Sequence, residues 1–118
     1  MATLILLEED TNMTKYILDE TKFDEMQTKI IKKCIEAGYN PESFADPKYE
    51  WTKMHIAFHA MRNEIDMSPY LDKFDIDQLE EIRIGLILGL DVSSYAIPEL
   101  SDDDMRHKRM SIAFNKTN

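Results

Sequence analysis

The fold is decided by the sequence FDIDQLEEIRIGLILGLDVSSYAIPELSDDDM at residues 74–105, because residues 23–54, FDEMQTKIIKKCIEAGYNPESFADPKYEWTKM, repeat its pattern without a gap. Both copies begin with Phe-Asp, carry Gln four residues after the Phe, and place Gly and then Pro at matching positions. The stretch between them carries a weaker third copy at about half that offset, so the period is 25–26 residues. A period this short is typical of repeat proteins, in which each unit buries its apolar face only against its neighbours.

The third unit predicts a long helix with defined ends. Its apolar residues recur at spacings of three and four, which forms one apolar stripe on a helix: Leu79, Ile82, Leu86 and Leu90. Asp75 or Asp77 is placed to cap the start of this helix. Gly89, like Gly38 in the first unit, is placed to end it, because glycine tolerates the left-handed backbone found there.

A one-turn helix should follow each long helix. In the third unit Asp91 or Ser93 can cap it, and Pro98 ends the segment. One aromatic residue per unit should then insert between neighbouring long helices and be buried at equivalent depth: Phe44, Tyr70 and Tyr95.

These patterns predict a mainly α protein, a small array of three helix–short helix repeats of about 25 residues. The predicted units are about residues 23–50, 51–74 and 75–101, followed by a final helix at about 102–114. The long helices are expected at roughly 24–37, 51–63, 76–88 and 102–114.

Residues 1–22 are expected to form a cap over one end of the repeat domain, which spans residues 23–118. Apolar and β-branched residues on either side of a turn-forming cluster at residues 8–12 favour a β-hairpin. The alternative is a degenerate repeat, because residues 18–24 resemble residues 71–75 with two residues inserted.

Composition places the chain among single-domain globular proteins: it has 118 residues, 43% of them hydrophobic, and one cysteine. The apolar run at the start is too short for a membrane span and lacks a preceding basic residue, so a soluble, cytoplasmic protein is expected.

The net charge of −9 is unevenly distributed. Residues 64–104 hold 12 acids and 2 bases, whereas residues 105–118 hold 4 bases and no acid. The acidic block argues against direct binding of nucleic acid and is compatible with a basic surface on a partner protein. Solubility alone also explains such a charge.

The run at residues 82–105 resembles a helical repeat of phage and conjugative-element proteins of Firmicutes, with the pattern I-R-x-G-L-x-x-G-L-D-V-S-x-Y-A-x-P. The match is close in the third unit, good in the first and eroded in the second, and covers about residues 23–110. The resemblance implies a mobile-element protein without catalytic residues. Small acidic proteins of such elements often inhibit host defence, as anti-CRISPR and anti-restriction proteins do.

The second unit departs from its sister units along one helix face. Four residues share this face at positions that are polar in the other copies: Trp51, His55, Phe58 and Arg62. An aromatic face of this kind predicts a partner-binding surface with Trp51 and Phe58 at least partly exposed. The alternative is that residues 4–7 fold over it.

Metal binding and catalysis find little support in the sequence. His55 and His59 have the i, i+4 spacing of a metal-binding helix, but no third ligand is fixed near them, so surface histidines are favoured and no metal or cofactor is expected. Cys34 is expected to be a buried or half-buried thiol. No nucleophile elbow or phosphate-binding glycine loop is present, so the chain is not expected to be an enzyme.

Acidic residues cluster at successive long-helix starts, which a repeat places side by side: Asp72, Asp75, Asp77, Glu80, Glu81, Asp102, Asp103 and Asp104. Helix capping and solvation explain some of them. A row of carboxylates could also imitate a phosphate backbone and occupy the nucleic-acid groove of another protein.

The function expected from the sequence is non-enzymatic binding of a host protein that has a basic, nucleic-acid-binding surface, in the host cytoplasm. One alternative is a structural module that forms a homodimer through the face of Trp51 and Phe58. A second alternative is a metal-dependent regulator.

Overall fold

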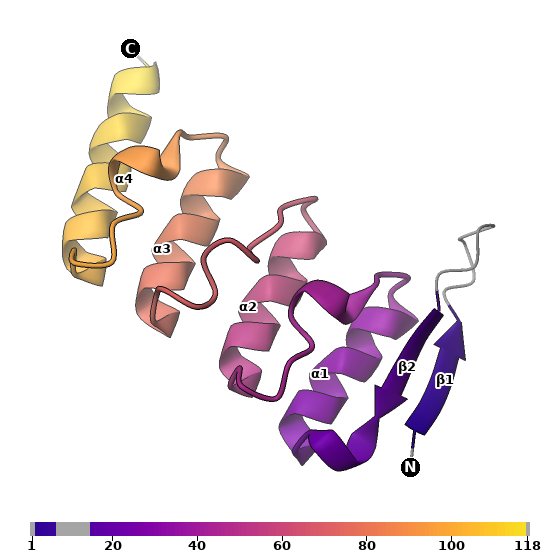
Figure 1. Ribbon diagram of the computed structural model, residues 1–118. Helices are drawn as coiled ribbons and strands as arrows, with labels where there is room; N and C mark the ends of the chain where they lie inside the picture. Colours follow the sequence, from indigo (N-terminus) through magenta and orange to yellow (C-terminus); the bar gives the residue numbers. More distant parts are fainter. Residues whose placement is uncertain (1, 7–14, 118) are drawn as a thin grey trace.

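A computed structural model describes residues 2–6 and 15–117, with side chains from residue 16 to residue 115, and it shows the predicted mainly helical array (Figure 1). The long helices are α1 (Glu25–Glu36), α2 (Trp51–Met61), α3 (Ile76–Ile87) and α4 (Asp102–Thr117). One-turn 3₁₀ helices are η1 (Glu20–Lys22), η2 (Pro41–Ser43) and η3 (Val92–Ser94). Each predicted long helix is confirmed, with α4 extending a few residues further.

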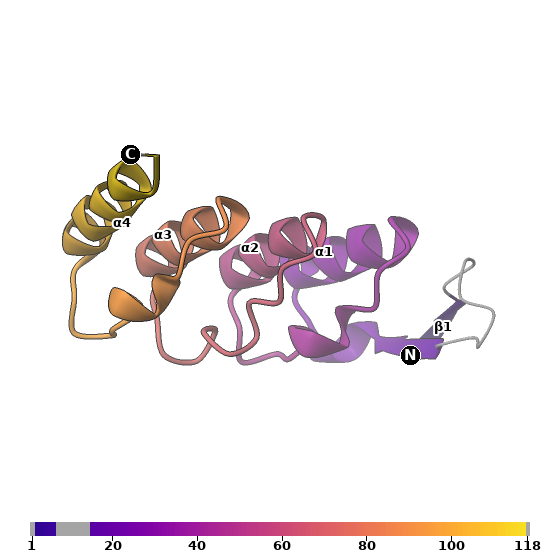
Figure 2. The ribbon, with the colours of Figure 1, turned by 90° about the horizontal axis from the view of Figure 1, so that it is seen from above.

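The long helices lie side by side in one row and run in the same direction (Figure 1). Seen from above, the connecting segments and 3₁₀ helices form a second layer along one side of this row (Figure 2). Each long helix packs against the next one along the chain. The arrangement follows from the period, because each unit returns the chain to the same edge before the next helix begins. All helix starts therefore share one edge.

The N-terminal segment contains the predicted β-hairpin. Strands β1 (Ala2–Leu6) and β2 (Lys15–Asp19) pair antiparallel, with Leu4 opposite Ile17. The hairpin lies at the α1 end of the row (Figure 1), where Leu18 of β2 is completely buried. The segment thus caps the first repeat.

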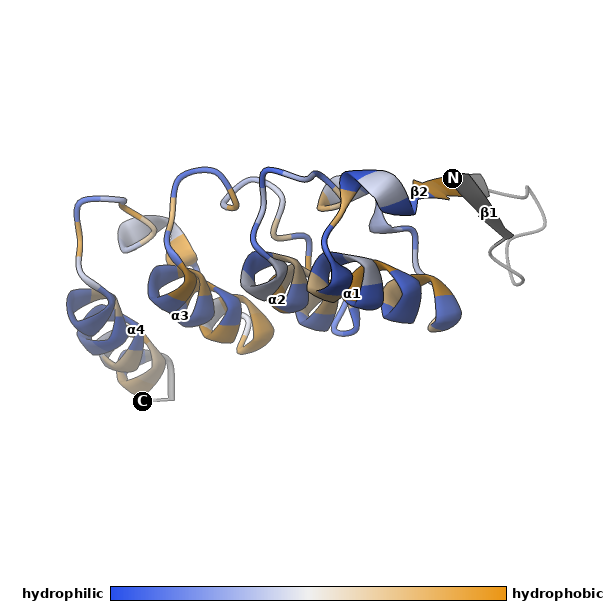
Figure 3. Ribbon diagram, turned by 90° about the horizontal axis from the view of Figure 1, so that it is seen from below, coloured by the Kyte–Doolittle hydropathy of each residue, from blue (hydrophilic) through white to orange (hydrophobic). Residues whose placement is uncertain are grey.

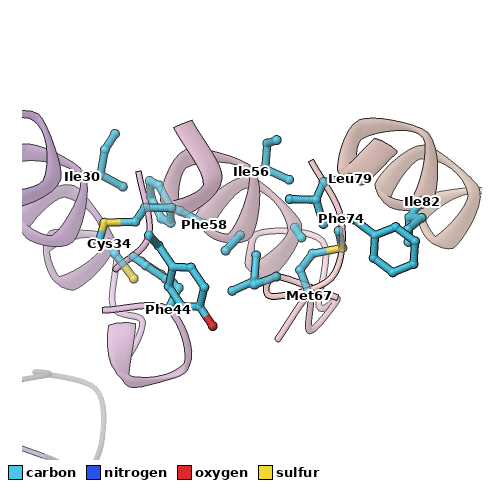
Figure 4. Packing of buried hydrophobic residues seen from close by; sticks show 14 of the residues in the cluster. Ile30, Cys34, Phe44, Ile56, Phe58, Met67, Phe74, Leu79 and Ile82 are labelled. Atoms are coloured by element: carbon cyan, nitrogen blue, oxygen red, sulfur yellow. The ribbon is translucent and has the colours of Figure 1, made fainter. Parts of the chain in front are cut away.

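The core lies between the helix row and the connecting layer (Figure 4). Its fully buried side chains recur at equivalent places in successive units: Ile31, Met54, Leu79 and Ile82 from the long helices, and Pro41, Phe44, Met67 and Tyr95 from the connecting segments. Burial of this stripe stabilises the array, since each large apolar side chain contributes about 1.5–3 kcal/mol when removed from water.

Two buried glutamines connect the starts of α1 and α3 to the segment that follows each of these helices. The Gln78 side chain accepts a hydrogen bond from the Asp75 amide (2.9 Å) and donates to the carbonyl oxygens of Pro98 and Leu100 (3.0 and 2.7 Å). Gln27 makes the same contacts two repeats earlier, in the first unit, with Asp24, Pro47 and Tyr49. In the second unit Lys53 takes this position and donates to the Leu71 carbonyl oxygen.

The helix ends confirm the predicted glycine positions. Gly38 and Gly89 have φ angles of 91° and 75°. The residue after each donates its amide to the carbonyl oxygen five residues earlier, as in a Schellman motif. In the second unit Glu64 occupies the same position with φ 60°, and the amide of Ile65 donates to Ala60. Glu64 therefore adopts the left-handed backbone conformation that glycine adopts in the first and third units.

Replacing Glu64 with Gly is expected to stabilise the fold by about 1 kcal/mol, because glycine adopts the left-handed conformation without steric penalty. The measurement is urea unfolding followed by far-UV circular dichroism. Glu36→Gly serves as the control, since Glu36 lies within α1 and glycine there should destabilise by about 0.5–1 kcal/mol. Equal destabilisation by both changes would contradict the assigned role of Glu64.

The predicted short helix is absent from the second unit, where residues 68–73 form turns. Asp66 still accepts the amide of Ser68, as Asn40 and Asp91 do for the amides two residues after them in the other units. Pro69, however, stands where the other units have Ser43 and Ser94. The Tyr70 amide still donates to the Met67 carbonyl oxygen (2.9 Å), as the Phe44 and Tyr95 amides do in the other units. Pro69 has no amide hydrogen, however, so it cannot donate the preceding bond that a 3₁₀ helix of three residues also needs.

The predicted equivalence of the three aromatic residues is wrong at one position. Phe44 and Tyr95 are completely buried, whereas Tyr70 is only partly buried. The Tyr95 hydroxyl donates to the Glu81 carbonyl oxygen (2.8 Å) over Gly85, where an added Cβ would lie 1.9 Å from the hydroxyl oxygen.

The position equivalent to Gly85 explains this difference. It is Cys34 in the first unit, which faces a phenylalanine without a hydroxyl, and Ala60 in the second. In the third unit the Tyr95 hydroxyl fills the space that a Cβ on Gly85 would need. Ala60 has this Cβ, so a tyrosine in the second unit cannot reach the depth of Tyr95.

Candidate functional site

The starts of the parallel helices bring several of the predicted acids to one edge. This edge faces the viewer in Figure 3, where the beginning of α4 is largely hydrophilic. Asp75 and Asp77 lie at the start of α3, and three aspartates lie in the first turn of the adjacent α4: Asp102, Asp103 and Asp104. These carboxylates face the positive ends of the two helix dipoles.

Capping uses only part of this acidic edge. Asp75 is the N-cap of α3 and accepts the Gln78 amide (2.8 Å). Asp77 is exposed. In α4 the cap is Ser101, whose hydroxyl oxygen accepts the Asp104 amide (3.0 Å), so the three aspartates are surplus to capping. Asp103 forms an ion pair with Arg106 on the same helix.

The three other predicted acids are engaged within the protein. Asp72 accepts the Tyr49 hydroxyl (2.9 Å) and pairs with Lys48, and these two hydrogen bonds lower the pKa of Asp72. Glu80 forms a two-point ion pair with Arg83 (2.8 and 2.9 Å).

Glu81 pairs with Arg109 (2.9 Å), and both side chains are largely buried where α3 meets α4. Its role is therefore packing of the array. The acidic edge available to a partner consists of five residues: Asp75, Asp77, Asp102, Asp103 and Asp104.

The predicted aromatic face divides into two parts. Trp51 is 39% exposed and His55 is exposed, but Phe58 is only 6% exposed, so the expectation that Phe58 is accessible is wrong. Phe58 packs edge-on against Tyr39 with ring centres 6.3 Å apart, and the Arg62 guanidinium lies 5.9 Å from the Phe58 ring centre. The physical reason is that α2 has a neighbouring helix on each side, and Phe58 faces the α1 side.

The exposed part lines a groove of about 370 Å³ between α2 and α3. From α2 the groove is lined by Trp51, His55 and His59. From α3 it is lined by Ile76, Glu80 and Arg83. This cavity is called the Trp51 groove below. Residues 2–6 do not cover it, because β1 lies beyond α1 at the far end of the row (Figure 1); residue 7 lies outside the described residues.

The Trp51 groove meets the acidic edge at the start of α3. Ile76, which lines the groove, is flanked in the chain by the exposed Asp75 and Asp77. The groove also holds Thr52, whose Oγ1 is the one buried side-chain oxygen or nitrogen without a hydrogen-bond partner among the described residues. A buried polar atom of this kind is uncommon in a folded protein.

The two histidines of α2 face each other. Their Nε2 atoms lie 3.1 Å apart, which fits a hydrogen bond between one protonated and one unprotonated nitrogen. The pKa of His59 lies below its ordinary value because partial burial disfavours the charged ring. The charges of His55, Arg83 and Arg62 lower it further, and Glu80 acts in the opposite direction.

Cys34 is completely buried, as expected, and burial raises the pKa of its thiol to about 12. A protonated buried thiol is a poor nucleophile. Among the described residues no three His, Cys, Asp or Glu side chains are grouped to hold a metal ion. None of the helices in the described part of the chain combines the length and apolar character that a membrane span requires.

The sequence analysis missed Ile76 and Arg83, which α3 contributes to the groove beside the predicted Glu80, and it missed the two clamping glutamines. The glutamines had a signal, since Gln27 and Gln78 match across the 51-residue offset. Ile76 and Arg83 had none, because only the packing of α2 against α3 brings them beside Trp51. Comparison with known proteins finds no matching family model, no matching curated protein and no matching solved structure.

Proposed function

We propose that this chain is a non-enzymatic binding protein that docks the Trp51 groove and the acidic edge onto a basic surface of a partner protein. The observation that carries the proposal is the position of Trp51. The only tryptophan is 39% exposed at the start of α2, in a groove that opens beside the exposed carboxylates of Asp75 and Asp77.

An accessible tryptophan in a groove is a suitable anchor for a protein interface. Tryptophan is enriched among the residues that dominate binding energies, because one side chain removes a large apolar area from water and can also donate a hydrogen bond. Apolar and polar contacts together match the usual composition of an interface centre.

The acidic edge supplies the charged surroundings of this anchor. Asp77, Asp102 and Asp104 form no ion pair within the described part of the chain, and they lie in the first turns of adjacent helices. Carboxylates in this position attract a basic surface and speed association. They repel a phosphate backbone, so nucleic acid itself is not the proposed ligand.

The partner class follows from the charge of this surface and from the resemblance to repeats of phage and conjugative-element proteins. Carboxylates in a row suit a site that normally receives phosphates. The proposed partner is a host nucleic-acid-handling protein, such as a defence nuclease, and the proposed role is inhibition in the host cytoplasm, as in anti-CRISPR or anti-restriction proteins. The second candidate is self-association through the Trp51 groove, favoured by the exposure of Trp51.

Capture from host lysate at low and moderate salt tests the proposed partner class. A basic nucleic-acid-binding protein should be recovered at low salt and lost as the salt concentration rises. A variant that combines Asp102→Asn, Asp103→Asn and Asp104→Asn should capture less of it and show a weaker salt dependence. Its stability should fall by about 0.3–1 kcal/mol per replaced charge at most, because the Ser101 cap remains.

A matched control separates a local effect from one of net charge. Glu42→Gln, Glu64→Gln and Asp66→Asn remove the same number of charges around a different cavity, between α1 and α2 at the helix-end side. This control should bind like the parent. If both variants captured equally little of the partner, the effect would be one of net charge. If only the chain itself were recovered, self-association would be favoured.

A further inference from the structure

Two histidine rings of α2 lie close together in the wall of the Trp51 groove, in an arrangement that docking a basic surface does not by itself explain. His55 and His59 lie one helical turn apart, and both are exposed. Their Nε2 atoms lie 3.1 Å apart and their ring centres 4.3 Å apart. The same nitrogen of each ring therefore lies next to that of the other.

We propose that His55 and His59 bind a divalent transition-metal ion of the Zn²⁺, Ni²⁺ and Cu²⁺ class through their two Nε2 atoms. With metal–nitrogen distances of about 2.0–2.1 Å, nitrogens 3.1 Å apart subtend an angle of roughly 95–100° at the ion. That angle lies between the octahedral and tetrahedral values. Little movement of either ring is needed to receive the ion.

The donor set defines the metals that fit. Imidazole nitrogens suit Zn²⁺, Ni²⁺ and Cu²⁺, whereas Ca²⁺ and Mg²⁺ require oxygen ligands. No third donor is grouped with the two rings among the described residues, so water completes the coordination. Glu80 lines the same groove and pairs with Arg83, so the carboxylate offsets the charge of the guanidinium near the ion.

A hydrogen bond between two neutral rings gives the same 3.1 Å distance and is the competing explanation. The two explanations differ in their response to metal. A metal requires both nitrogens unprotonated, with the N–H of each ring on Nδ1, whereas the hydrogen bond needs one protonated Nε2. Titration with metal therefore distinguishes them, and it needs no partner protein, so its outcome is independent of the proposed function.

The single tryptophan provides the readout. The Trp51 and His55 rings have centres 6.4 Å apart, so a bound Cu²⁺ ion, which is paramagnetic, should quench the fluorescence of Trp51. The expected result is saturable quenching with one ion per chain, relieved when Zn²⁺ is added as a competitor. His55→Gln and His59→Gln should each raise the midpoint about tenfold or more, the equivalent of about 1.4 kcal/mol.

His107→Gln is the matched control, because His107 is an exposed histidine on α4, away from the groove. It should leave the midpoint unchanged, and far-UV circular dichroism should show all variants folded. The proposal would be overturned if Cu²⁺ did not quench the parent, or if the double variant His55→Gln/His59→Gln had the same midpoint as the parent. The contact between the two rings would then be a hydrogen bond only.

Discussion

Gly85→Ala should destabilise this protein by about 3 kcal/mol, although alanine normally favours a helix by about 1 kcal/mol over glycine. Gly85 lies inside α3, and a Cβ there would be 1.9 Å from the Tyr95 hydroxyl oxygen and 2.8 Å from Val92 Cγ1. Tyr95 cannot withdraw without breaking its hydrogen bond to the Glu81 carbonyl oxygen and opening the core. The measurement is urea unfolding followed by far-UV circular dichroism.

A second substitution tests the cause of this loss. Tyr95→Phe removes the hydroxyl and should by itself cost about 1 kcal/mol, the value of one hydrogen bond. Combined with Gly85→Ala it should recover about 1–2 kcal/mol relative to the sum of the single changes, because the closest contact disappears. The recovery should be partial, since Val92 remains 2.8 Å from the new Cβ.

The first repeat offers a natural precedent for the double variant. There Cys34 faces Phe44, and both are completely buried (Figure 4). A larger residue at the helix position is thus accompanied by an aromatic ring without a hydroxyl. If Gly85→Ala were as stable as the parent, or if the two changes were simply additive, the packing of Tyr95 over Gly85 would be wrong.

The sequence predicted the long helices and their ends well because both depend on local pattern. Apolar spacing defines the buried stripe, and Gly38 and Gly89 supply the left-handed positions that end α1 and α3. The hairpin followed from β-branched residues on either side of a turn. None of these features requires knowledge of contacts between distant residues.

The repeat pattern failed where one residue in one unit changes the geometry. Pro69 removes an amide donor, and the second short helix does not form. Ala60 fills the space that Gly85 leaves, and Tyr70 stays partly exposed to solvent. An alignment of the units treats such positions as equivalent, whereas packing depends on the volume of each pair of facing residues.

The candidate site was predictable only in part because side-chain partners come from different units. Trp51 and His55 could be identified from their departure from the repeat. The burial of Phe58 against Tyr39 could not, since it depends on how α2 packs beside α1. Likewise Glu81 pairs with Arg109, 28 residues away, and so leaves the acidic edge.

Trp51→Ala is expected to weaken partner binding by more than about 2 kcal/mol, roughly a thirtyfold increase in Kd. The side chain is accessible before binding and is placed to become buried against the partner, so its truncation removes apolar contact area at the centre of the interface. Folding should change little, because 39% of the residue surface is already exposed and the helix begins with the same backbone.

The matched control is Met110→Ala on α4. Met110 is 55% exposed, more than Trp51, and does not line the Trp51 groove. It should bind with the Kd of the parent. Comparing the two separates loss of a specific anchor from loss of any exposed apolar side chain.

The most direct measurement is therefore the Kd of parent, Trp51→Ala and Met110→Ala for the captured partner at physiological salt, with sedimentation of the free chain to detect self-association. We predict a Kd at least about thirtyfold higher for Trp51→Ala alone, with the parent and Met110→Ala equal. An unchanged Kd for Trp51→Ala in a folded protein would contradict the assignment of the Trp51 groove as the binding surface.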